Sequence, residues 1–223
     1  MVDFSLMQDF IYNIAISLPA FLFAIVFHEW SHAYMALRFG DTTAKSAGRL
    51  TLDPIVHADP IGTILFPLIG AAMGGVIFGW AKPVPVDPRR FSNVKMGIFW
   101  VSFAGPLANI VLAVLSAFTY ALIITQVPQT FSYYSTIKEM VHASILINVV
   151  LAVFNLIPFP PLDGSKMVSS LLDYNSARKY EELGRFSFVF IAILWFTNLF
   201  SYLMIPAIVI MNLFVSIFMR MLA

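Results

Sequence analysis

The sequence predicts an all-α polytopic membrane protein with about five spanning helices, a re-entrant element and short membrane-associated β-strands. Of its 223 residues, 60% are hydrophobic and only 11% are charged, whereas a soluble domain carries roughly 25% charged residues. Long apolar segments recur along the chain, and basic residues gather between them. Pieces bounded by Gly and Pro predict the re-entrant element and the strands. We expect a single integral membrane domain over residues 1–223.

The composition excludes several kinds of site and partner. The chain has no cysteine, so it can form neither a disulfide nor a thiolate metal site. Any metal must therefore be bound by imidazole and carboxylate groups. The formal net charge is +1, which gives no reason to expect a nucleic acid as partner.

The apolar segments define the expected spans, because a spanning helix needs about 20 mostly apolar residues. These segments are 10–37, 61–79, 97–125, 141–157 and 186–219. The last one is too long for a single crossing at about 1.5 Å per residue. We expect it to fold as a hairpin near 198-NLFS-201; the alternative is one helix kinked at Pro206.

The Lys and Arg residues predict which side of the membrane each loop faces. Residues 1–9 and 126–137 contain neither Lys nor Arg, whereas 38–60, 80–96 and 158–185 each contain at least three. We therefore expect the N-terminus and 126–137 outside, and the basic segments and the C-terminus in the cytoplasm. The expected location is the cell membrane.

The apolar segment 61–79 is predicted not to cross the membrane. Basic segments flank it on both sides and both favour the cytoplasm. Its five glycines and one proline also make a poor helix interior. We interpret it as a re-entrant element, and the alternative is a full crossing against the charge rule. The stretches 44-AKSAGRLTLDP-54 and 82-KPVPVDP-88 are expected to be short extended pieces.

The stretch 28-HEWSH-32 carries ionisable groups inside an apolar helix. Positions i and i+4 lie on one helical face, so His28 and His32 can meet one ion. Glu29 flanks that ion, and the H-E-x-x-H arrangement supplies two zinc ligands and a general base for water. Such groups at membrane depth indicate a functional site; the alternative is hydrogen bonding between helices.

A catalytic zinc needs a third protein ligand and an open position. Asp163 is a candidate, because it follows the proline-broken stretch 155-NLIPFPPLD-163 after a spanning segment. The charge topology brings it to the same side as His32. From the residues alone, capping of a helix that starts at Gly164 is an equal alternative. A His-His-carboxylate set fits zinc better than other divalent ions.

Two motifs together carry a family resemblance. The motifs 28-HEWSH-32 and 155-NLIPFPPLDG-164 resemble those of the site-2 protease family of intramembrane zinc metalloproteases, in the same order. The segment 104-AGPLANIVLA-113 is similar to the family's Gly-Pro-x-x-Asn helix. The resemblance covers nearly the whole chain and implies a compact member without an extra regulatory domain.

The resemblance implies a role for each matching residue. His28 and His32 would be zinc ligands with Asp163 as the third, at one zinc per chain, and Glu29 would be the general base. Asn155 would donate its amide to the oxyanion of the tetrahedral intermediate.

Two further side chains have open roles. Asn109 would make a polar contact near the site, or else a hydrogen bond between packed helices. His57 could line the substrate entrance or approach the metal, and the alternative is that loop hydrogen bonds hold it. His142 is expected to be structural.

The predicted reaction is hydrolysis of peptide bonds within or near transmembrane segments. The expected partners are the lipid bilayer and single-span membrane proteins, whose helices must unwind locally. The stretch 48-GRLTL-52, with Arg49, Leu50 and Thr51, could hold the unwound piece by β-augmentation. The alternatives are an ion or proton transporter with the same His, Glu and Asp groups, and a catalytically silent protein that binds membrane segments.

Overall fold

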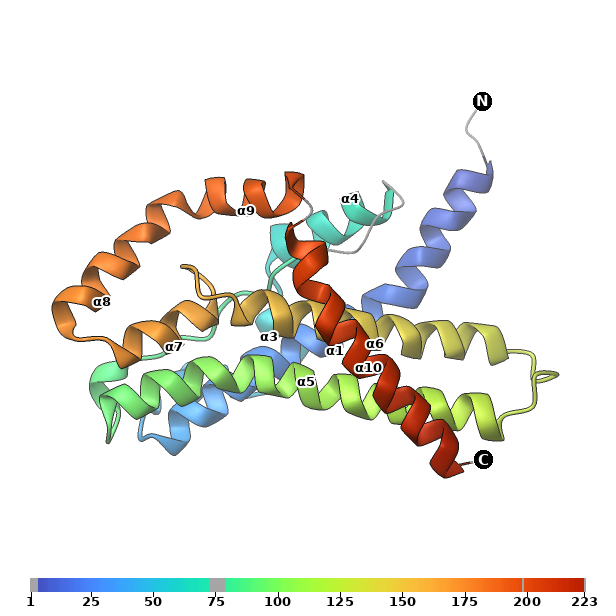
Figure 1. The fold of residues 1–223 in the computed structure, drawn as a ribbon, viewed down its shortest axis with the longest axis horizontal. Coiled ribbons are helices and arrows are strands. Elements are labelled where there is room, and N and C mark those ends of the chain that lie inside the picture. The colour runs from blue at the N-terminus through green and yellow to red at the C-terminus, as the bar shows by residue number, and fades with distance from the viewer. Residues whose placement is uncertain (1–3, 73–78, 198, 223) are drawn as a thin grey trace.

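The computed structural model describes residues 4–72, 79–197 and 199–222, and in these ranges all regular structure is helical. Among the described residues, four helices are long and apolar enough to cross a membrane, over Phe10–Arg38, Val94–Gln126, Tyr134–Leu156 and Leu199–Leu222. They belong to α1 (Phe4–Arg38), α5 (Val94–Gln126), α6 (Tyr134–Leu156) and α10 (Leu199–Leu222). In Figure 1, α1, α5 and α6 run along the long axis of the molecule and α10 crosses them obliquely. The multi-pass membrane architecture is therefore confirmed.

Helix α5 is the central element, because it contacts α1, α6, α7 (Asp163–Leu171) and α10. Gly105, Asn109, Ala113, Ala117 and Ala121 recur every fourth residue on it, and all five are buried. Small side chains let helix backbones approach closely in a membrane. Ala113 and Ala117 pack in one apolar cluster with residues of α6 and α10.

Two hydrogen bonds show which helix ends lie together. Tyr12 Oη donates to Glu139 Oε2 (2.6 Å), which joins the early part of α1 to the start of α6. Gln126 Nε2 donates to the carbonyl oxygen of Leu222 (2.9 Å), which joins the end of α5 to the end of α10. The C-terminal end of α10 thus lies at the end of the bundle where the α5–α6 loop lies. Our expectation that the C-terminus shares the side of the basic segments is therefore wrong.

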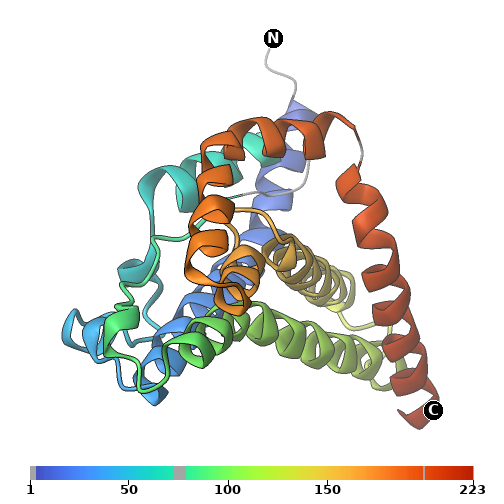
Figure 2. The same ribbon diagram turned by 60° about the vertical axis from the view of Figure 1, so that its left-hand side comes forward.

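The C-terminal apolar segment is two helices, but only one of them is long enough to span. It consists of α9 (Ser187–Phe196) and α10, so the expected break near residue 198 is present although residue 198 itself lies outside the described ranges. The 10 residues of α9 extend only about 15 Å, half of the roughly 30 Å hydrocarbon core. Figure 2 shows α9 across the top of the molecule and α10 descending to the C-terminus. The expected fifth spanning helix is therefore wrong.

The predicted β-strands are also wrong for the described residues. Thr43–Ser46 form the short helix α2, Pro54–His57 form α3, and the residues between them pair with no strand. Residues 79–87 follow an irregular path to the 3₁₀ turn η2 (Pro88–Arg90). Pro83 and Pro85 have no N–H to donate to a ladder. The stretch 48–52 accordingly offers no strand edge for β-augmentation.

The apolar segment 61–79 is partly described. It begins in a π-helical turn η1 (Pro60–Leu65) and continues as α4 (Phe66–Ala72), while residues 73–78 lie outside the described ranges. Trp80 N donates to Gly62 O (3.1 Å), and Thr63 Oγ1 donates to Trp80 O (2.9 Å). Trp80 therefore lies beside Gly62 and Thr63. The described helix is shorter than a span.

The remaining helices follow α6 and surround one end of the bundle. A proline-rich turn leads to α7, and then α8 (Tyr174–Glu181) and the 3₁₀ turn η3 (Glu182–Phe186) lead to α9. In Figure 1 these elements form an arch from α7 through α8 to α9. Helix α7 packs against the first half of α5 and the end of α6. This packing places the start of α7 opposite the end of α1.

Candidate active site

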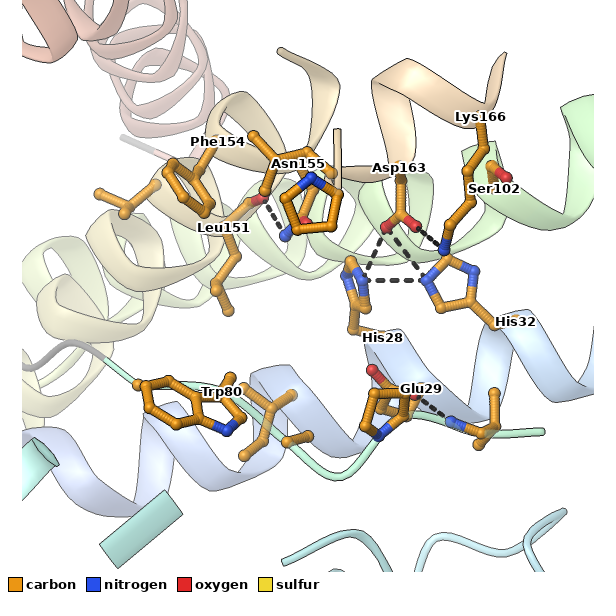
Figure 3. A pocket seen from close by; sticks show the side chains of 18 of the residues that line it. His28, Glu29, His32, Trp80, Ser102, Leu151, Phe154, Asn155, Asp163 and Lys166 are labelled. Atoms are coloured by element: carbon orange, nitrogen blue, oxygen red, sulfur yellow. Dashed lines mark hydrogen bonds and ion pairs between the residues drawn. The ribbon is translucent and has the colours of Figure 1, made fainter. Parts of the chain in front are cut away.

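Three ligating side chains converge between α1 and the start of α7. His28 and His32 lie one turn apart on α1, and their Nε2 atoms are 3.0 Å apart. Asp163 Oδ2 lies 3.2 Å from each of them. All three side chains are buried and could hold one metal ion. Figure 3 shows both imidazoles directed at the Asp163 carboxylate.

Asp163 lies at the start of α7 with its carboxylate beside the two histidines. Helix α7 begins at Asp163 itself, with Leu162 as N-cap residue and without a side-chain capping bond. The carboxylate faces the two histidines, and its other oxygen, Oδ1, lies 3.4 Å from Lys166 Nζ. The prolines before it prevent regular helix, so the chain turns between α6 and α7. Asp163 therefore makes no side-chain capping bond in α7, and its role as a metal ligand stays a prediction.

Hydrogen bonds fix the tautomer of both histidines. His28 Nδ1 donates to Asn109 Oδ1 (2.6 Å), and His32 Nδ1 donates to the Val101 carbonyl oxygen (2.6 Å), both on α5. With the protons on Nδ1, both Nε2 lone pairs point toward the space shared with Asp163. Such partners orient metal-ligating histidines and raise their basicity. Asn109, whose role the sequence left open between a contact near the site and helix packing, therefore contacts His28 directly.

The three groups fit a zinc ion in their spacing. Tetrahedral zinc with bonds of about 2.0–2.1 Å separates its ligand atoms by roughly 3.3 Å, close to the 3.0 and 3.2 Å found here. Gly105 of α5 lies next to the two histidine Nε2 atoms. A Cβ atom on Gly105 would lie 2.5 Å from His32 Nε2 and 2.6 Å from His28 Nε2. The absence of a side chain at residue 105 thus keeps the ligand space open.

Glu29 lies beside the triad and is half-buried. Its Oε2 accepts a hydrogen bond from the Val84 backbone N–H (2.8 Å), in the irregular segment that follows Trp80. Pro83 and Pro85 on either side of Val84 restrict the backbone there. Glu29 and the triad line one cavity of about 1090 Å³. The remaining lining is largely apolar and includes residues of α1, α5, α6, α9 and α10.

Asn155 lines the same cavity near the end of α6. Its Nδ2 donates to the Leu151 carbonyl oxygen of its own helix (3.0 Å). In Figure 3 it lies on the α6 side of the cavity, near Asp163. The Asn155 side chain thus lies at the cavity wall, and its role toward an oxyanion stays a prediction.

The other suggested contact residues lie away from the cavity. His57 is fully buried, and its Nε2 donates to the Thr51 carbonyl oxygen (2.8 Å). The Arg49 guanidinium donates to the Lys82 carbonyl oxygen (2.6 Å). Arg49, Leu50, Thr51 and His57 do not line the cavity. Arg49 and His57 instead tie their loop to residue 82, two residues before Val84, because Lys82 N also donates to His57 O (2.9 Å).

Several residues that shape the site carry little signal in the sequence. Gly105 and Asn109 are four residues apart and share a helical face, which was the available signal for Gly105. Val101 contributes through its carbonyl and Val84 through its N–H, so neither side chain carries a signal. Asn148, which contacts Asn109, occurs in an apolar run where a buried amide indicates a specific partner. His142 lies on α6 beside the Tyr120 ring, apart from the triad.

The fold and the site together define a multi-pass membrane protein with a buried His-His-Asp cluster that could hold a metal ion. The model of peptidase family M50 matches residues 16–196, so the chain belongs to peptidase family M50. The predicted family is thereby confirmed, and the chain is a metalloprotease with zinc as its cofactor.

Individual relatives agree with this assignment. The chain is 38% identical to "Putative zinc metalloprotease YwhC" of Bacillus subtilis over 201 residues, 87% of this chain and 89% of that protein. It is 30% identical to "Putative zinc metalloprotease Rip2" of Mycolicibacterium smegmatis over 183 residues, 81% of this chain and 66% of that protein. For Rip2 of Mycobacterium tuberculosis H37Rv the identity is 28% over 178 residues, 80% of this chain and 65% of that protein. No solved structure gives a significant match.

Proposed function

We propose that the protein is an intramembrane endopeptidase that hydrolyses peptide bonds within or near the transmembrane segments of single-span membrane proteins. The observation that carries this proposal is the position of the triad and Glu29 in one largely apolar cavity among the spanning helices. An apolar cavity suits an apolar substrate segment, and the ionisable groups gathered there indicate chemistry. Membership of family M50 does not favour the transporter or the silent binder.

In the proposed reaction, His28, His32 and Asp163 would hold zinc, and three protein ligands suit a catalytic rather than a structural zinc. Zinc, when bound there, supplies a Lewis acid that acidifies water and polarises a carbonyl. Glu29 takes the proton from the attacking water and delivers it to the leaving amine. The Val84 N–H holds one carboxylate oxygen of Glu29 and leaves the other free to accept this proton. Asn155, after rotating away from Leu151 O, donates its amide to the developing oxyanion.

The proposed orientation puts the triad end of the bundle at the cytoplasmic side. Arg38 ends α1 there, and basic residues 82, 89, 90 and 95 precede or begin α5. By the charge rule this end stays in the cytoplasm, while the N-terminus, the α5–α6 loop and the end of α10 face outside. In this orientation the described residues 61–72 stay on the cytoplasmic side of the bundle, and Trp80 lies beside Gly62 through its N–H bond to Gly62 O. Water would reach the site from the cytoplasm.

The proposal is tested by incubating purified, zinc-loaded protein in detergent with candidate single-span proteins that carry a label at each end. Products are sized and sequenced by mass spectrometry, and a soluble unfolded protein serves as the comparison substrate. We expect cleavage within or beside the apolar segment of the single-span protein, dependent on zinc and on Glu29. Cleavage confined to soluble regions, at equal rates in both substrates, would contradict the intramembrane assignment.

A further inference from the structure

A run of hydrogen-bonded side chains leads from His28 into the interface of α1, α5 and α6. His28 Nδ1 donates to Asn109 Oδ1 (2.6 Å), and Asn109 Nδ2 donates to Asn148 Oδ1 (2.9 Å). Asn148 Nδ2 in turn donates to the Ser144 carbonyl oxygen (2.9 Å). Asn109 and Asn148 are 0% and 1% exposed, and neither lines the cavity. Two buried amides thus connect a metal-site histidine to the backbone of α6.

The orientation of the Asn109 amide decides what His28 can bind. An amide has an acceptor end and a donor end, and a neutral imidazole has one nitrogen of each kind. With Oδ1 toward His28, the imidazole proton stays on Nδ1 and the Nε2 lone pair faces the triad. With the amide reversed, Nδ2 would donate to Nδ1, and the proton would move to Nε2. A proton on Nε2 blocks the lone pair that a metal needs.

The donor–acceptor orientation of both amides is determined by the Ser144 carbonyl. The Ser144 carbonyl can only accept, so Asn148 must present Nδ2 to it and Oδ1 to Asn109. Asn109 must then present Nδ2 to Asn148 Oδ1 and Oδ1 to His28. Ala24 O, 3.2 Å from Asn109 Nδ2, favours the same orientation. Reversing Asn109 would place its oxygen against two other oxygens in a buried site, where unpaired polar groups are unfavourable.

We propose that Asn148 is a positioning residue, which orients Asn109 and thereby keeps His28 in the tautomer that binds metal. Asn148 touches neither substrate nor metal and acts through Asn109. The inference rests on the proposed zinc ligation by His28. Residues that orient ligating histidines typically affect metal affinity by about 10–100-fold, and the more remote Asn148 belongs at the lower end of this range.

The test compares Asn148→Leu with Asn148→Asp. Leucine has a similar volume but cannot accept from Asn109. Aspartic acid, which burial favours in its neutral form, can accept from Asn109 through its carbonyl oxygen and donate its O–H to Ser144 O. Ser116→Ala is the matched control, because Ser116 Oγ contacts Ser144 Oγ (2.8 Å), beyond Asn148 in the run.

Zinc affinity is measured by competition with a chromophoric chelator, and cleavage is measured as a function of free zinc. We expect Asn148→Leu to weaken zinc binding about tenfold and to recover its cleavage rate at saturating zinc. Asn148→Asp and Ser116→Ala should bind zinc like the parent protein. Recovery at saturating zinc separates a lost metal-binding tautomer from general damage to the fold.

Parent affinity in Asn148→Leu would overturn the inference, and so would an equal loss in the Leu and Asp variants, since packing would then be the cause. If the Leu variant does not fold, Asn148→Ala replaces it under the same criteria. Failure of the parent protein to bind zinc would overturn the proposed metal site itself. The two failures are therefore distinguishable.

Discussion

Replacing Gly105 with alanine tests whether the space among His28, His32 and Asp163 is a metal site. The new Cβ atom would lie 2.5 Å from His32 Nε2 and 2.6 Å from His28 Nε2. Ordinary contacts of a Cβ atom begin at 3.4 Å, so these nitrogens must recede by about 0.8–0.9 Å. The rings cannot turn freely, because each Nδ1 is held by a hydrogen bond to α5.

Zinc sites tolerate ligand displacements of only about 0.2 Å. Displacing two ligands at once should weaken zinc binding more than the loss of one hydrogen bond that orients a ligand. We therefore expect zinc affinity to fall by at least about 100-fold, or about 2.8 kcal/mol at the usual 1.4 kcal/mol per tenfold change. Cleavage should fall with the bound zinc.

The assay is zinc per chain by elemental analysis after equilibration with a competing chelator. Gly184→Ala is the matched control, because a Cβ atom there would meet only Pro160 Cβ at 3.5 Å, an ordinary contact. The control should fold and retain zinc. A folded Gly105→Ala protein with parent zinc affinity would refute the ligand geometry.

Three further predictions concern the ligand set, the topology and the loop beyond α1. Asp163→Ala should lose much of its zinc in the same elemental analysis, and full zinc with full activity would remove Asp163 from the ligand set. Single cysteines at Ser92 and Ser176 should react with an impermeant thiol reagent from the same side of sealed vesicles; labelling from opposite sides would show that 61–79 crosses. Burial raises the pKa of Asp41, but hydrogen bonds from Thr43 and the Asp87 N–H outweigh it and hold that pKa below its usual 3.8. The ionised Asp41 carboxylate therefore stabilises the folded protein above pH 3.8, and this stabilisation is lost as the pH falls through the lower pKa of Asp41 in the folded protein. Acid should thus lower the thermal midpoint more in the parent protein than in Asp41→Asn. Equal reductions in the two proteins would contradict this linkage.

The geometry of the histidine pair could be predicted because it depends only on helical period. His28 and His32 share a face of any α-helix, and the long apolar run around them predicts the helix. Asp163 was harder, since its position depends on how the chain turns after α6. The residues alone left helix capping open, and the packing of α7 against α5 determines where the carboxylate points.

Gly105 shows what sequence reasoning misses. A glycine carries no functional group, and its importance comes from the close approach of α5 to the two imidazoles. The same holds for the Val84 N–H and the Val101 carbonyl, which act through the backbone. Such contributions depend on distances between segments far apart in the chain.

The errors in the predicted fold have local physical causes. Residues 82–88 carry prolines that are typical of extended structure, but these prolines lack the N–H donors that a strand ladder requires. The 34-residue apolar stretch 186–219 suggested two crossings, yet the break after Phe196 leaves α9 too short for one. Hydropathy alone does not locate that break.

The proposed zinc hydrolase chemistry is tested most directly by measuring zinc content and peptide-bond cleavage together in Glu29→Gln. Glutamine keeps the size of the side chain and can still accept from the Val84 N–H, but it cannot take a proton. We expect the parent zinc content and a cleavage rate lowered by about 10²–10⁴-fold. A Glu29→Gln protein that binds zinc and cleaves at the parent rate would contradict the assignment of Glu29 as general base.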